Sequence, residues 1–137
     1  MKLLLDTHTF LWFIAGDAQL DDYARQLIED LGNERYLSVA SMWEITIKSS
    51  LGRLMVPLPP SALIREHIWA NAIDLLTIKP EHLDVLHNLP YHHKDPFDRL
   101  LLAQSIQDDS PYARSGVQGI RGSSCVVTNI KINALVG

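Results

Sequence analysis

The fold follows from the stretch KLLLDTHTFLWFIAG, residues 2–16. Its apolar run at 2–5 stops at Asp6, and periodicity alone does not separate strand from helix in so short a run. Residues 7–15 then carry apolar side chains at helical spacing and end at Gly16, which predicts a short helix with a glycine stop. A strand, an aspartate and a helix in this order are typical of a βα unit in a parallel sheet.

The remaining sequence alternates in the same way. Further strands are predicted at 36–39, 75–78 and 125–128, and helices at 21–31, from a Ser38 or Ser41 cap to about 51, from Pro59 or Pro60 to about 72, at 80–89 and at 95–107. This alternation predicts an α/β fold with three α/β/α layers, in which helices flank a short central parallel sheet. Ligands of such sheets bind beyond the carboxyl ends of the strands, where Asp6 is placed.

The length and composition are those of one ordinary globular domain, predicted to span residues 1–137. The net charge is −4, which argues against a protein that grips nucleic acid mainly by a basic surface. A nucleic-acid enzyme remains compatible with this charge, because bound divalent cations offset phosphate charge.

Three features of the sequence indicate the cellular location. Cys125 is the only cysteine, so that an internal disulfide is impossible, which suits the reducing cytoplasm. Asp6 and His8 interrupt the apolar start, which is unlike a signal peptide. No apolar run approaches the roughly 18 residues of a membrane span, so we expect a cytoplasmic protein without a membrane partner.

Three acids are the candidate catalytic and metal-binding residues, namely Asp6, Glu44 and Asp98. Phosphodiester hydrolysis needs an activated water and neutralised phosphoryl charge, and one or two hard cations held by carboxylates supply both. Acids after the first strand, on a middle helix and at the start of a late helix are able to converge on such ions. Their spacing permits this site without requiring it.

Each acid also has a plain structural interpretation. Asp6 is able to cap the helix that begins at Thr7. Glu44 lies four residues before Lys48, a spacing that is typical of a solvated ion pair on a helix. Asp95 fits an N-cap before Pro96, with a further acid in the first turn favoured by the helix dipole.

Three segments together resemble the PIN-domain family, in particular the VapC-type ribonuclease toxins of VapBC toxin–antitoxin pairs. They are residues 3–8 (LLLDTH), 41–45 (SMWEI) and 93–105 (HKDPFDRLLLAQS), and the last is the most specific. The resemblance covers roughly residues 1–109 and resumes at 126–128 (VVT).

That resemblance implies a hydrolase, a Mg²⁺-dependent endoribonuclease toxin that cleaves RNA and is neutralised by a cognate antitoxin. It also implies a homodimer and Mn²⁺ as a substitute metal. Asp6, Glu44 and Asp98 match the metal-binding acids of the family, while Thr7 and Ser41 match small polar positions that would hold water or the metal ligands in place. Asp95 either binds metal or only caps its helix, and we favour capping.

The carboxyl-terminal part departs from the family pattern. Residues 108–124 form a longer Ser/Gly-rich insertion, and residues 125–137 are truncated or divergent. Ile130 stands where a fourth acid is expected, and Asn129 offers only an uncharged oxygen. The alternative function is therefore a catalytically impaired remnant that acts only by binding its antitoxin.

Two other sites are disfavoured by spacing. His92 and His93 lack a second ligand pair for structural zinc, and an aspartyl-phosphate mechanism would require an acid at the position of His8. The aromatic residues Trp12, Phe13, Trp43 and Trp69 lie in apolar helical stripes, which predicts core positions rather than platforms for stacked bases.

Overall fold

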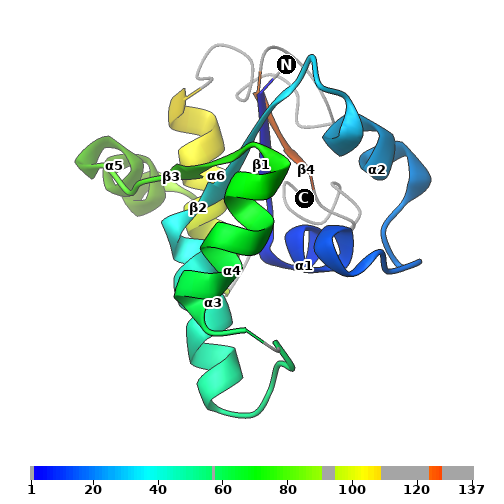
Figure 1. Ribbon diagram of the computed structural model, residues 1–137. Coiled ribbons are helices and arrows are strands. Elements are labelled where there is room, and N and C mark those ends of the chain that lie inside the picture. Colours follow the sequence, from blue (N-terminus) through cyan, green and yellow to red (C-terminus); the bar gives the residue numbers. More distant parts are fainter. Residues whose placement is uncertain (1, 57, 91–94, 109–123, 128–137) are drawn as a thin grey trace.

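The computed structural model describes residues 2–56, 58–90, 95–108 and 124–127 (Figure 1). Its elements are β1 (Lys2–Leu5), α1 (Thr7–Ala15), α2 (Asp22–Glu29), β2 (Glu34–Ser38), α3 (Val39–Ser50), α4 (Pro60–Leu63), η1 (Ile64–Ile68), η2 (Trp69–Asn71), β3 (Ile73–Leu76), α5 (Pro80–Asn88), α6 (Pro96–Asp108) and β4 (Ser124–Val127). None of the described helices is long and apolar enough to cross a membrane.

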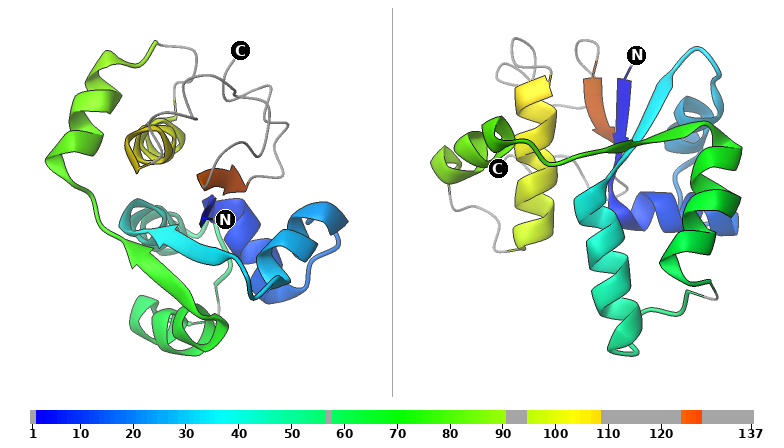
Figure 2. Two further views of the ribbon diagram at one scale, coloured as in Figure 1. Left: turned by 90° about the horizontal axis from the view of Figure 1, so that it is seen from above. Right: turned by 60° about the vertical axis from the view of Figure 1, so that its left-hand side comes forward.

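The strands form a parallel sheet in the order β3-β2-β1-β4. Helices α5 and α6 cover one face of this sheet, and α1, α2 and α4 cover the other (Figure 2). The predicted α/β fold with three layers is therefore confirmed. The first strand is central, with β2 on one side of it and β4 on the other.

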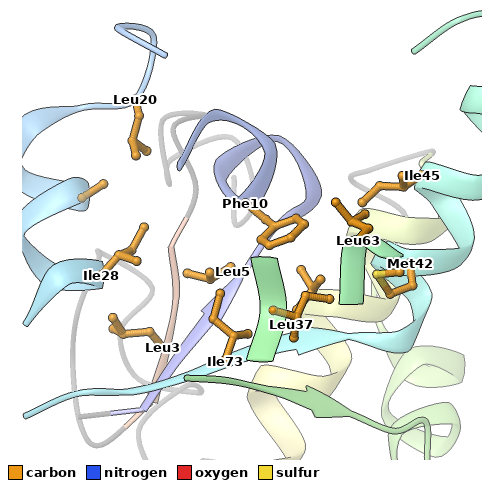
Figure 3. Close-up of a cluster of buried hydrophobic side chains, with 12 residues drawn as sticks. Leu3, Leu5, Phe10, Leu20, Ile28, Leu37, Met42, Ile45, Leu63 and Ile73 are labelled. Atoms are coloured by element: carbon orange, nitrogen blue, oxygen red, sulfur yellow. The ribbon is translucent and has the colours of Figure 1, made fainter. Parts of the chain in front are cut away.

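Alternate side chains of β1 face the two helical layers. Leu3 and Leu5 belong to the main core, which also contains Phe10 of α1 and Leu37 of β2 (Figure 3). Leu4 instead helps to line a hollow of about 330 Å³ that also involves α6. The apolar run at the start of the sequence is thus buried on both faces, as central parallel strands usually are.

Short polar residues start the first three helices. Asp6 accepts a hydrogen bond from the Thr9 amide at 2.8 Å, and Asp21 caps α2 in the same way. Ser38 accepts from the Ala40 amide, which settles the cap of α3 in favour of Ser38. Gly16 ends α1 at φ 63°, a left-handed conformation that glycine adopts without steric cost.

After α3, one predicted helix and one predicted strand have different boundaries in the structure. The helix expected to run to about 72 is an α-helical turn at α4 followed by the π-helix η1 and the 3₁₀-helix η2, and it ends at Ala72 with φ 53°. The strand predicted at 75–78 lies earlier, at Ile73–Leu76, because pairing with β2 begins at Ile73 and Pro80 already opens the next helix.

The second helix ends earlier than the sequence predicted. Asp30 is extended, so that α2 stops at Glu29 and Leu31 lies outside it, 88% exposed. The buried Arg35 of β2 donates to the carbonyl oxygens of Ile28 and Asp30 at 2.8 and 3.1 Å. This guanidinium pairs carbonyl groups at the end of α2 that further helical turns would otherwise have paired.

Candidate active site

The three candidate acids come from α1, α3 and α6, whose first turns lie toward the carboxyl end of the sheet (Figure 2). Asp6 follows β1 directly, Glu44 lies in α3 after β2, and Asp98 lies in the first turn of α6. Asp6 is 6% and Glu44 is 3% exposed. The structure thus brings together residues that are far apart in the sequence.

Glu44 is held by partners on two helices. The Thr7 hydroxyl donates to Glu44 Oε1 at 2.6 Å, across from α1 to α3. Lys48 forms an ion pair with Glu44 Oε2 from one turn further along α3. The solvated helical pair suggested by the spacing of these residues is therefore wrong for Glu44, because that side chain is buried and only the lysine is partly exposed.

The half-buried Asp98 experiences the charges of the other acids. Burial, followed by the nearby charges of Asp95, Glu44 and Asp6, raises the pKa of Asp98 to about 6, and His8 opposes this rise. A carboxyl group surrounded by other carboxylates loses its proton less readily because each further negative charge adds repulsion. Burial is the largest cause, and the smaller contributions of Glu44 and Asp6 put both acids within electrostatic reach of Asp98; the three are called the acidic cluster below.

Asp95 has a structural role at this cluster. Its side chain accepts hydrogen bonds from the amides of Phe97 and Asp98, at 2.9 and 3.4 Å. These are the bonds of an N-cap, and the residue is exposed. The predicted capping role of Asp95 is confirmed by this geometry.

Lys48 is the cation that faces the cluster from α3. Its hydrogen bond to Glu44, assisted by the charges of Glu44, Asp95 and Asp98, raises its pKa, while burial acts in the opposite direction. The ammonium group consequently stays protonated and offsets part of the negative charge. The sequence showed the spacing of Lys48 and Glu44 but gave no sign that Lys48 would balance acids on another helix.

Comparison with known proteins gives one match. Residues 3–116 match the family model of the PIN domain, which is most of the chain. The chain belongs to the PIN-domain family. No curated protein and no solved structure gives a significant match. PIN domains are generally metal-dependent nucleases, which accounts for an acidic cluster at this end of the sheet.

The carboxylate and hydroxyl oxygens at this end of the PIN domain are the ligand types that bind a hard divalent cation. The Ser41 hydroxyl is buried near the start of α3 and has no hydrogen-bond partner among the described residues. Carboxylate and hydroxyl oxygens are what Mg²⁺ prefers. As the side chains stand, however, no three acidic, histidine or cysteine groups in the described ranges are grouped closely enough to hold one ion.

Two further predictions from the sequence concern Asn129 and the aromatic residues of the helices. Asn129, the possible replacement for the fourth acid, lies outside the described residues. Trp43 and Trp69 are 59% and 64% exposed, so their predicted core positions are wrong. Trp12 and Phe13 do pack against the main core, as predicted. The stripes misled because α3 buries Met42, Glu44 and Ile45 rather than Trp43, and η2 buries none of its residues.

The Thr7 hydroxyl should stabilise the fold through Glu44. We expect Thr7→Val to lower the free energy of unfolding by about 1–2 kcal/mol, because a buried carboxylate loses a hydrogen-bond donor. Thr7→Ser keeps a hydroxyl and should lose clearly less. Urea unfolding at neutral pH measures both variants as shifts of the midpoint at unchanged slope. A Thr7→Val protein as stable as the wild type would contradict the role given to this bond.

Proposed function

We propose that the protein is a metal-dependent endoribonuclease in which Asp6, Glu44 and Asp98 hold Mg²⁺, with Mn²⁺ as a substitute. The observation that carries the proposal is the raised pKa of Asp98 within a PIN domain, which is caused first by burial and then by the charges of Asp95, Glu44 and Asp6. Uncompensated repulsion of this kind costs folding stability, and bound cations relieve it. Ser41 supports the proposal through its unpartnered buried hydroxyl.

The residues of the chain have separate tasks in this proposal. A bound divalent ion supplies an activated water and neutralises charge on the phosphoryl oxygens. The bond from the Thr9 amide to Oδ1 orients the Asp6 carboxylate, and Oδ2 is the oxygen proposed to bind the cation. Thr7 fixes Oε1 of Glu44, which sets the direction of that carboxylate before any ligand arrives. Asp98 is ionised and able to bind a cation above about pH 6.

The proposal is tested by cleavage of a structured RNA pool with the purified chain. We expect cutting with Mg²⁺ or Mn²⁺ and none with excess EDTA, because the acids alone do not activate water against a phosphodiester. Restoring activity by adding metal back to the EDTA sample excludes damage by the chelator. Absence of cutting by folded protein on several RNAs and both metals would contradict the proposal.

The biological setting proposed for this nuclease is that of a cytoplasmic toxin, which forms a homodimer and is silenced by a cognate antitoxin. Support comes from the three sequence segments at 3–8, 41–45 and 93–105, which resemble VapC-type toxins. The single cysteine agrees with a reducing compartment. We do not favour the non-catalytic alternative, because the set of Asp6, Glu44 and Asp98 is intact.

A further inference from the structure

A hollow of about 330 Å³ lies between the sheet and the second half of α6. Its described lining comes from β1, β2, β3, the connection from β3 to α5, and α6. Lys2 at the start of β1 is part of this lining, whereas Asp6 follows the end of that strand. Ser105, another lining residue, is seven positions after Asp98 on α6, which corresponds to about 10 Å along a helix. The hollow is therefore separate from the acidic cluster.

The charged side chains that line the hollow are positive. They are Lys2 and Lys79, both exposed, and no acid is among the described lining residues. Neither lysine forms an ion pair within the part of the chain that the structure describes. Glu34 is the strand partner of Lys2, and Asp74 that of Tyr36, but neither acid lines the hollow. Two unpaired ammonium groups in a protein of net charge −4 favour a ligand with two negative charges.

The inner wall of the hollow is apolar apart from one buried amide. Leu4 is buried, and Leu76 and Tyr36 are half-buried. Gln104 is wholly buried, and its Nε2 atom donates to the Thr77 carbonyl oxygen at 3.3 Å. Its Oε1 atom has no donor among the described residues. Because an unpaired buried oxygen costs free energy, a donor that enters the hollow would be bound favourably.

We propose that the hollow binds a small organic phosphate, a phosphate monoester about the size of a nucleoside monophosphate. Lys2 and Lys79 hold the phosphate, because ammonium groups form charge-assisted hydrogen bonds with its oxygens. The apolar wall takes the organic part, and a hydroxyl or amino group of the ligand donates to Gln104 Oε1. The volume of the hollow is in the range of small-molecule sites. This inference is independent of the proposed function, because none of the three acids takes part.

The probe is adenosine monophosphate, which combines a phosphate with a ring, hydroxyl groups and an amino group. Its binding is measured by isothermal titration calorimetry in EDTA, so that no divalent cation links the phosphate to the acidic cluster. Inorganic phosphate and adenosine are titrated separately. We expect half-saturation by adenosine monophosphate below about 1 mM, and binding about 10-fold weaker or less for either part alone, because each part uses only half of the hollow.

Lys79→Met and Gln104→Leu test the two ends of the hollow. We expect Lys79→Met to weaken binding of adenosine monophosphate about 5- to 10-fold, and Gln104→Leu to weaken it about 3-fold or more. Arg53→Met is the matched control, because Arg53 is exposed, has the same charge as lysine and does not line the hollow. This control and Asp98→Asn should bind the probe as the wild type does. Thermal unfolding without the probe checks the fold of each variant, and the exposed position of Lys79 keeps that variant informative if Gln104→Leu does not fold.

Four outcomes would overturn the inference. One is half-saturation of the wild type above about 1 mM. Another is inorganic phosphate that binds as tightly as adenosine monophosphate, which would leave no role for the apolar wall or Gln104. Equal losses in Lys79→Met and Arg53→Met would show an effect of overall charge alone. Loss of binding in folded Asp98→Asn would instead place the probe at the acidic cluster.

Discussion

Asp6→Asn should retain the fold and lose RNA cleavage by about 10²-fold or more. Asparagine accepts the same N-cap hydrogen bond as aspartate, so the bond from the Thr9 amide is kept while the negative charge is lost. Even residues that only support metal ligands typically contribute about 10- to 100-fold to metal affinity or activity, and a ligand itself should contribute at least as much. Cleavage with Mg²⁺ and urea unfolding are measured side by side.

Asp21→Asn is the matched control for this variant. Asp21 caps α2 through its side chain as Asp6 caps α1, but it is exposed and lies in another part of the chain. Its substitution should change neither cleavage nor stability noticeably. If Asp6→Asn cleaves RNA at the wild-type rate, Asp6 only caps α1 and is not a ligand of the proposed metal site.

Asp98→Asn should abolish cleavage and also make the metal-free protein more stable at neutral pH. The pKa of Asp98 is raised from 3.8 to about 6 in the folded protein. Because the folded state holds this proton more tightly than the unfolded chain does, the free energy of unfolding falls as the pH rises through this interval. Above about pH 6 the wild type loses the full free energy of unfolding that ionising Asp98 removes, whereas the neutral asparagine of the variant loses none.

The expected gain in EDTA at neutral pH is about 1–2 kcal/mol, a value discounted for the half-buried position of Asp98. The gain should vanish below pH 3.8, where the wild-type carboxyl is protonated in both states. Saturating Mg²⁺ should reverse the order, because an ion that binds only the folded wild type stabilises it. Asp74→Asn, at an exposed acid of β3, serves as the control and should show neither effect. Equal stability of Asp98→Asn and the wild type at every pH would contradict the electrostatic cluster.

The fold could be predicted from local chemistry wherever one segment decides its own structure. Asp6 and Gly16 bound α1 with a cap and a left-handed stop, and both signals are legible in the sequence. The π-helix η1 carries no such signal, because its backbone depends on how Ile68 and its neighbours fit the core between α4 and β3. Tertiary packing of this kind overrides helix propensity and has no local signature.

The candidate site could be predicted in part, for a related reason. The positions of the acids made Asp6, Glu44 and Asp98 candidates for a shared metal site, and the family resemblance favoured that interpretation over the plain structural one. Glu44 is buried with a hydrogen bond from Thr7, which is 37 positions away in the sequence, whereas i,i+4 spacing alone suggested a solvated pair with Lys48. The exposure of Trp43 likewise depends on what covers α3, and an apolar stripe does not show which of its members remains uncovered.

The central place of β1 in the sheet determines when a newly made chain is able to complete its structure. Its partner β2 follows within about forty residues, but its other neighbour, β4, is Ser124–Val127. During translation one edge of β1 therefore lacks its native partner until residue 127 has left the ribosome. An open edge of this kind recruits foreign strands. Chains that stall or terminate before that point should therefore aggregate through the strand that leads to Asp6.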